Sequence, residues 1–131
     1  MAEKVVVDTS VVVEILEKGD RDLLYKVAAR DAYISYVTLY EYLWGFCYIG
    51  RDYLREKEVL EKIFRVVYPT QEIVLRAIEM DVDLAKRGEK VPQADIIIAA
   101  TAIALGAPLF TKDPRHFPKL ERYGLRVMTS L

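Results

Sequence analysis

Short uninterrupted apolar runs alternate with helix-like segments along the whole chain, and this alternation constrains the fold more than any other feature. Val5-Val6-Val7 is a continuous β-branched run, typical of a strand that is buried on both faces. Similar runs lie at 32–36, 64–68, 108–111 and 125–128. Strands of this kind, separated by helices, predict a parallel sheet with right-handed crossovers. We therefore expect an α/β fold.

The segments between these runs carry helix signals. We expect helices at 11–16, around 23–28, from Thr38 to near Gly50, at 52–63, at 70–86 and at 96–105. The helix at 70–86 should bury its apolar positions, which are Ile73, Val74, Ala77, Ile78, Val82 and Leu84. The helix at 96–105 is apolar nearly all round, so it should be central and buried.

Length and composition indicate one globular domain spanning residues 1–131. The chain is 53% hydrophobic and 30% charged, with a net charge of −1. Its apolar runs are too short to span a membrane, and the first strand begins too early for a signal peptide to precede it. Cys47 is the single cysteine, which excludes an internal disulfide and a cysteine-based zinc site. We expect a cytosolic protein with Cys47 in its core.

Four carboxylates stand where an apolar run meets a turn or a helix start. Asp8 and Asp113 follow the first and fourth expected strands, and Glu41 lies early in the helix that leaves the second strand. Asp95 begins the helix that leads into the fourth strand, so it should lie at the same edge of the sheet. Ligands of parallel sheets bind at this carboxyl edge. The topology therefore predicts that the four acids meet there.

A cluster of acids at this edge requires a neutralising partner. Carboxylates within ~4–6 Å of one another raise each other's pKa, which makes an uncompensated cluster unstable at neutral pH. Hard oxygen ligands suit Mg²⁺ or Mn²⁺, and a bound ion would activate a water and stabilise charge on a phosphoryl oxygen. The sequence offers no serine–histidine pair, glycine-rich phosphate loop or zinc-binding spacing as a competing site.

Each acid also has a purely structural explanation, and these explanations stay open on the sequence alone. Asp8, Asp95 and Asp113 occupy positions typical of helix N-caps. Thr38 and Glu41 match the spacing of a capping box, in which the glutamate bonds back to the cap residue.

Polar and basic residues surround the four acids. Thr9, Ser10 and Thr111 could each orient a water or a carboxylate, although local turn bonds would also explain them. Two groups of basic residues could follow a phosphate backbone: Lys112, Arg115 and Lys119, and, farther away, Arg51, Arg55 and Lys57. We expect His116, the single histidine, to serve in packing or hydrogen bonding rather than as a general base.

Aromatic residues crowd one segment of the chain: Tyr36, Tyr40, Tyr42, Trp44, Phe46, Tyr48 and Tyr53. They occupy more faces of the expected helix than one core contact needs. Because Tyr and Trp are enriched at interfaces, we expect a subunit or partner interface here.

With these motifs in hand, the chain resembles the PIN-domain nucleases, and most closely the VapC-type toxins of toxin–antitoxin pairs. The resemblance rests on Val5-Val-Val-Asp8-Thr-Ser, Thr38-Leu-Tyr-Glu41, Ala94-Asp95-Ile-Ile-Ile-Ala-Ala-Thr-Ala, and Leu109-Phe-Thr-Lys-Asp113-Pro-Arg-His-Phe117. It implies a three-layer α/β/α domain with a five-stranded parallel sheet. It also implies a Mg²⁺- or Mn²⁺-dependent endoribonuclease, usually a homodimer, that a cognate antitoxin inhibits.

The family's acidic quartet falls on Asp8, Glu41, Asp95 and Asp113. These residues would bind the metal or its waters and carry out catalysis. The family's site hydroxyl falls on Thr111, with Ser10 as a second candidate.

Three alternative functions remain. A phosphoacceptor receiver domain needs an aspartate at the end of the third strand, where this chain has Tyr68-Pro69-Thr70. A small-molecule phosphatase typically has a second aspartate two residues after the first, where Ser10 stands. An inactive PIN-like module would keep the acids and only bind a partner.

Overall fold

The sheet is five-stranded and parallel throughout, as the alternating pattern predicts. A computed structural model describes residues 2–131. The strands are β1 (Lys4–Val7), β2 (Asp31–Ser35), β3 (Arg65–Val67), β4 (Leu109–Phe110) and β5 (Val127–Met128). They lie in the order β3-β2-β1-β4-β5, which places β1 at the centre of the sheet.

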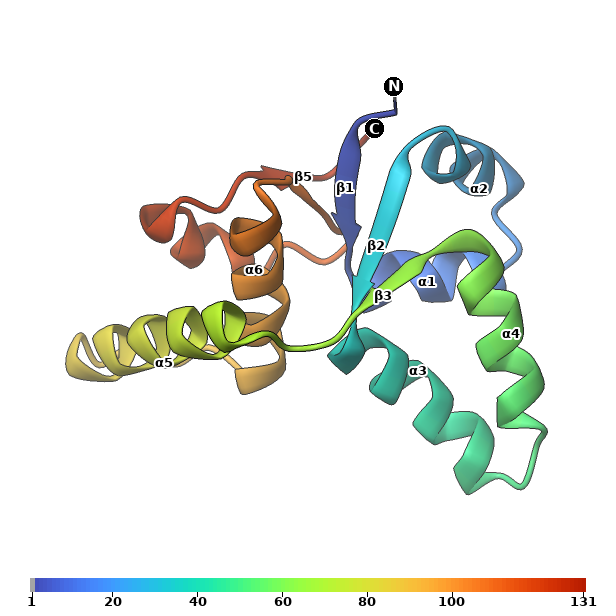
Figure 1. The fold of residues 1–131 in the computed structure, drawn as a ribbon, viewed down its shortest axis with the longest axis horizontal. Coiled ribbons are helices and arrows are strands. Elements are labelled where there is room, and N and C mark those ends of the chain that lie inside the picture. Colours follow the sequence, from blue (N-terminus) through green and yellow to red (C-terminus); the bar gives the residue numbers. More distant parts are fainter. Residues whose placement is uncertain (1) are drawn as a thin grey trace.

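Helices cover both faces of this sheet (Figure 1). They are α1 (Thr9–Leu16), α2 (Arg21–Ala28), α3 (Tyr36–Tyr48), α4 (Tyr53–Ile63), α5 (Gln71–Lys86) and α6 (Gln93–Leu105), followed by the 3₁₀ helix η1 (Phe117–Tyr123). In Figure 1, α5, α6 and η1 lie on one side of the sheet and α1 to α4 lie on the other. The three-layer α/β/α prediction is confirmed. None of the helices among residues 2–131 has the length and apolarity that a membrane crossing requires.

Alternate residues of β1 pack into two separate hydrophobic cores. Val6 packs with α5, α6 and η1, whereas Val5 and Val7 pack with α1 to α4. All three valines are fully buried. Side chains of a strand point alternately to opposite faces, so a strand between two helical layers must be apolar at every position. This requirement explains why the first strand reads Val-Val-Val rather than alternating.

The central position expected for the helix after Pro92 is confirmed. Its buried residues lie on several sides of α6: Ile96, Ile98, Ala99, Ala100, Thr101 and Ala102. The small alanines allow α6 to lie close to the sheet on one side and to α5 on the other.

The predicted burial is wrong at four residues. Val74, Ile78 and Val82 of α5 are about half exposed, because α5 packs on α6 through one narrow stripe that contains Ile73, Met80 and Leu84. Cys47 is exposed on α3, because this helix has apolar residues on more sides than the one that packs against the rest of the protein. Both helices therefore leave apolar surface uncovered.

We expect the two leucines of α4 to differ sharply in their effect on stability. Leu60 is fully buried and Leu54 is 57% exposed. Leu60→Ala should lower the free energy of unfolding by about 2–5 kcal/mol, because it leaves a cavity. Leu54→Ala should change it by less than about 0.5 kcal/mol. Urea unfolding of both variants measures the difference, and similar losses would show that α4 packs otherwise.

Candidate active site

Asp8 lies at the carboxyl end of β1 and is the N-cap residue of α1, but its side chain makes no capping bond. Instead, its Oδ2 accepts hydrogen bonds from Ser10 Oγ and from Thr111 Oγ1, each at 2.8 Å. The residue is only 7% exposed. The capping explanation is therefore wrong for this carboxylate, which two hydroxyls hold in place at the edge of the sheet.

Thr111 connects the ends of β1 and β4. Its side chain is fully buried, and its Oγ1 accepts a hydrogen bond from the backbone N–H of Asp113 at 2.9 Å while it donates to Asp8. Ser10 Oγ makes a parallel connection by accepting from the backbone N–H of Lys112 at 3.0 Å. The loop after β4 is thus fixed to the start of α1.

Glu41 belongs to the second turn of α3 and does not form a capping box. Ser35 is the N-cap of α3 and accepts from the backbone N–H of Val37, so the capping role expected for Thr38 is wrong. Glu41 Oε1 accepts from Thr9 Oγ1 at 2.9 Å, and Thr38 Oγ1 lies 3.1 Å from the same hydroxyl. Sequence reasoning missed this link, although Thr9 directly follows Asp8.

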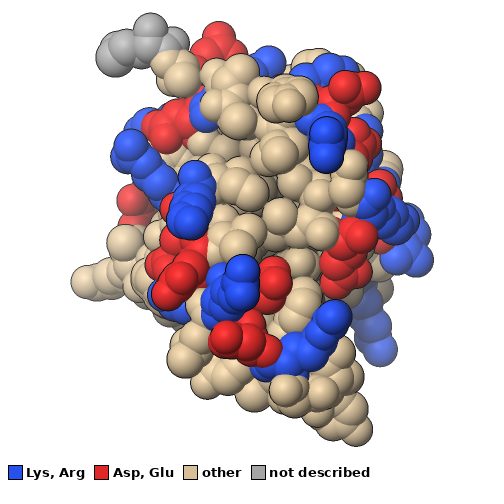
Figure 2. Space-filling view, turned by 90° about the vertical axis from the view of Figure 1, so that its right-hand side faces the viewer, with Lys and Arg blue, Asp and Glu red and all other residues tan. Residues whose placement is uncertain are grey.

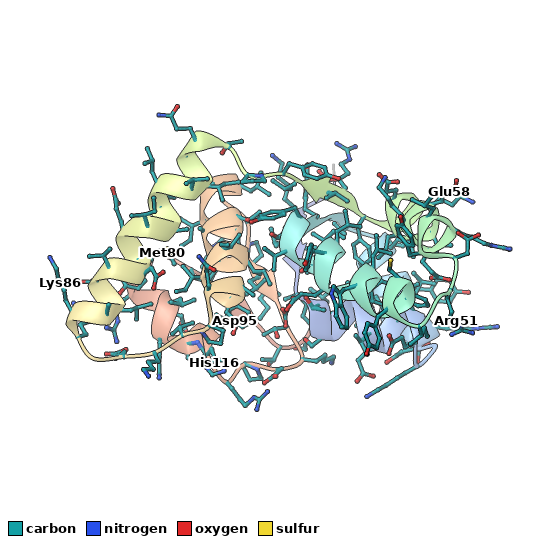
Figure 3. All side chains as sticks on the ribbon, turned by 90° about the horizontal axis from the view of Figure 1, so that it is seen from below. Arg51, Glu58, Met80, Lys86, Asp95 and His116 are labelled. Atoms are coloured by element: carbon teal, nitrogen blue, oxygen red, sulfur yellow. The ribbon has the colours of Figure 1, made fainter. Side chains whose placement is uncertain are left out.

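Asp95 lies in the first turn of α6, whose N-cap is Pro92, so it is not a cap either. Figure 3 shows it on the end of α6 that also faces His116. Burial is the largest cause that raises the pKa of Asp95; together with the negative charges of Asp8, Glu41 and Asp113, and against the opposing effect of His116, it brings that pKa to about 6. Asp95 therefore lies within the electrostatic reach of the other three acids.

Asp113 is the one member of the quartet with a cationic partner. Arg115 Nε donates to its Oδ1 at 2.8 Å and Arg115 Nη2 donates to its Oδ2 at 2.7 Å. These bonds hold the pKa of Asp113 below its usual range. From the sequence we expected Arg115 to face a phosphate backbone; here it binds a carboxylate of the site.

The donor set fits a hard divalent cation, although its side chains do not form a ready-made cage. All the candidate ligand atoms are oxygens, and a cation would favour the charged form of Asp95, whose pKa is raised first by burial and then by the neighbouring carboxylates. Within residues 2–131, however, no three Asp, Glu, His or Cys side chains converge closely enough to enclose an ion. Any bound metal would therefore keep several waters or require a side chain to move.

A large hollow lies away from the acids. It measures about 830 Å³ between α1, α3 and α4, and its lining includes Leu16, Phe46, Ile49, Arg51 and Arg55. None of the four acids lines it. Its lining combines apolar side chains with two arginines and three acids, Glu17, Asp52 and Glu56, so the hollow suits a binding partner better than the reaction itself.

We predict that Asp95→Asn stabilises the metal-free protein at pH 7. The folded-state pKa of about 6 lies above the ordinary 3.8, so ionisation of Asp95 opposes folding. The loss of folding free energy that ionised Asp95 causes is absent below about pH 4, grows between pH 4 and 6, and is complete above that range. For a fully buried group this loss would be roughly 3 kcal/mol; because Asp95 is partly exposed, we expect about 1–2 kcal/mol.

Urea unfolding in the presence of a chelator at pH 4 and at pH 7 measures this effect. The stability difference between Asp95→Asn and the wild type should be near zero at pH 4 and favour the variant at pH 7. An equal difference at both pH values would contradict the electrostatic explanation.

Comparisons with known proteins place the chain among nucleases. The PIN domain family model matches residues 5–123. A protein named Ribonuclease VapC1 from Methanocaldococcus jannaschii is 32% identical over 124 residues, which cover 95% of this chain and 86% of that protein. A VapC ribonuclease from Pyrococcus furiosus is 33% identical over 95 residues, covering 72% of this chain and 64% of that protein.

Solved structures share the fold at lower sequence identity. VapBC-1 from nontypeable Haemophilus influenzae has a TM-score of 0.80 at 22% identity and covers 95% of this chain and 96% of that one. VapBC2 from Rickettsia felis, solved bound to a DNA fragment from its promoter, has a TM-score of 0.81 at 19% identity and covers 95% and 97%. Given the family match and the Methanocaldococcus relative, the chain belongs to the PIN domain family, among its VapC-type ribonucleases.

Proposed function

We propose that this protein is a Mg²⁺- or Mn²⁺-dependent endoribonuclease and the toxin of a VapBC-type toxin–antitoxin pair. The observation that carries the proposal is the Asp8 carboxylate, which two hydroxyls hold beside three further acids rather than over a helix end. The names of the relatives support RNA as the substrate. Against a receiver domain, the chain continues after β3 as Tyr68-Pro69-Thr70, without the required aspartate.

In this proposal, Asp8, Asp95, Asp113 and Glu41 hold the metal or its waters. A divalent ion bound there would lower the pKa of a water and stabilise negative charge on the phosphoryl oxygens. Ser10 and Thr111 fix Oδ2 of Asp8 in one orientation.

The attack itself requires a group that handles a water. Glu41 is exposed, so it can position or deprotonate a water for in-line attack, and Thr9 holds its carboxylate at 2.9 Å. No covalent enzyme intermediate is needed, because water is the nucleophile.

The distribution of surface charge favours RNA binding at a few positions over binding along an extended basic surface. Figure 2 shows lysine and arginine side chains interspersed with aspartate and glutamate over the viewed face. Together with the net charge of −1, this mixture argues against binding by phosphate neutralisation alone. RNA binding would therefore depend on the metal and on the few cations beside the acids.

We also propose a protein antitoxin as partner. Solved structures that share this fold are VapBC complexes, including one from Salmonella typhimurium bound to DNA. The groove between α1, α3 and α4 is lined by apolar side chains and by charges of both signs, two arginines and three acids, which suits an antitoxin segment with apolar and charged side chains.

A second copy of the chain would cover the apolar surface on the opposite side of α3. Tyr40, Trp44, Tyr68, Val74 and Ile78 are 45–67% exposed there, and we call this set the dimer face. The dimer face contains two hollows, one lined by α3 and α4 and one lined by α5 and α6, and Tyr36 contributes to both. Exposed apolar surface of this extent is typical of a subunit interface.

Asp8→Asn should abolish Mn²⁺-dependent RNA cleavage, with a loss of at least about 100-fold in rate, because the metal site loses a charge. Asp20→Asn is the matched control, since Asp20 caps α2 through the backbone N–H of Leu23 and does not belong to the site. Sequencing of RNA ends in cells that express each variant measures cleavage and identifies the target. Equal cleavage by wild type and Asp8→Asn would refute the proposal.

Ile78→Glu should convert the dimer to a monomer, because it places a charge in the apolar dimer face; we expect association weakened at least about 30-fold. Tyr25→Glu provides the control, since Tyr25 is 68% exposed on α2, outside the dimer face. Sedimentation equilibrium measures both. A monomeric wild type, or an Ile78→Glu variant that still dimerises, would show that this surface has another role.

A further inference from the structure

Arg115 occupies both carboxylate oxygens of Asp113 at once. Its two donor nitrogens lie 2.8 and 2.7 Å from Oδ1 and Oδ2, a bidentate arrangement. The other acids have no such partner among the described residues: hydroxyls hold Asp8 and Glu41, and the Asp95 side chain has no hydrogen bond or ion pair there. The chain thus supplies one internal cation to four acids, and it sits on Asp113.

This ion pair can open at little cost. The Arg115 side chain is 76% exposed and that of Asp113 is 41% exposed. Exposed pairs contribute little to stability, because water solvates both partners and holding a long side chain costs entropy. No other hydrogen bond or ion pair among the described residues involves the Arg115 guanidinium. It is therefore free to leave.

We propose that Arg115 competes with the divalent cation for Asp113 and so sets the metal concentration at which the site fills. The inference rests on the proposed function, because it assumes that Asp113 holds the metal or its waters. In the metal-free protein, the guanidinium neutralises Asp113 and keeps its oxygens from the other acids. Metal binding then requires that the ion pair opens.

Competition of this kind also links the metal to the substrate. A guanidinium released from Asp113 matches a phosphate group in the same bidentate manner. RNA that binds the released Arg115 would favour the state in which the Arg115–Asp113 ion pair is open. Bound RNA would therefore increase the affinity for the metal, and bound metal would increase the affinity for RNA by the same factor.

The test is Mn²⁺ affinity, measured on the full chain by calorimetry and by the paramagnetic resonance signal of free Mn²⁺. Arg115→Gln should bind Mn²⁺ about two- to fivefold more tightly than the wild type, which is the range expected for loss of an exposed ion pair. Lys112→Gln is the matched control: it removes one positive charge from the same loop, and Lys112 Nζ lies over the ring of Phe110 rather than on an acid. Its affinity should change less.

A double-mutant cycle shows whether Arg115 acts through Asp113. In an Asp113→Asn background, Arg115→Gln should leave Mn²⁺ affinity unchanged, because the competed carboxylate is already gone. Urea unfolding of every variant checks that the fold is retained.

The outcomes separate the inference from the proposed function. If the wild type binds no Mn²⁺, the proposed function fails and the inference fails with it. If the wild type binds Mn²⁺ but Arg115→Gln has the same affinity, or shifts it no more than Lys112→Gln does, the inference alone is wrong and Arg115 forms only a local surface ion pair. A shift that persists in the Asp113→Asn background would likewise overturn it.

Discussion

The hydrogen bonds to Oδ2 of Asp8 are the interactions on which the site depends. Ser10 and Thr111 donate them from α1 and from the residue after β4, so the three residues join the central strand to its neighbour at the carboxyl edge. Thr111 also accepts from the backbone of Asp113. The position of one carboxylate thus determines the course of the loop that carries another.

The fold tolerates a local electrostatic cost to keep these acids together. Asp95 is held on the first turn of a buried helix, where burial and neighbouring charges favour its neutral form. A core that served stability alone would place an uncharged residue there. Clusters of this kind persist where function requires them. The stability that the acids cost is supplied by the two apolar cores, one on each face of the sheet.

Much of the architecture could be predicted from the sequence because strands buried on both faces must be apolar at every position. The strand Val5-Val6-Val7, the central helix after Pro92 and the shared edge of the four acids all follow from that rule and from parallel connectivity. Burial on α3 and α5 could not be predicted in this way. Both helices carry more apolar residues than the monomer can cover, and periodicity does not show which stripe meets the core.

The contacts within the site were also beyond sequence reasoning. Capping motifs depend on where each helix begins, and Ser35 rather than Thr38 is the N-cap of α3. The pairing of Arg115 with Asp113 depends on the turn between them, which residue types alone do not specify.

We propose that the acids at the carboxyl edge form one divalent-cation site. A crystal structure of the wild type grown with Mn²⁺, with anomalous differences recorded, tests it most directly. We expect an anomalous peak among the carboxylates of Asp8, Asp95 and Asp113. A well-ordered structure with no peak at that edge, or with Mn²⁺ bound only elsewhere, would contradict it.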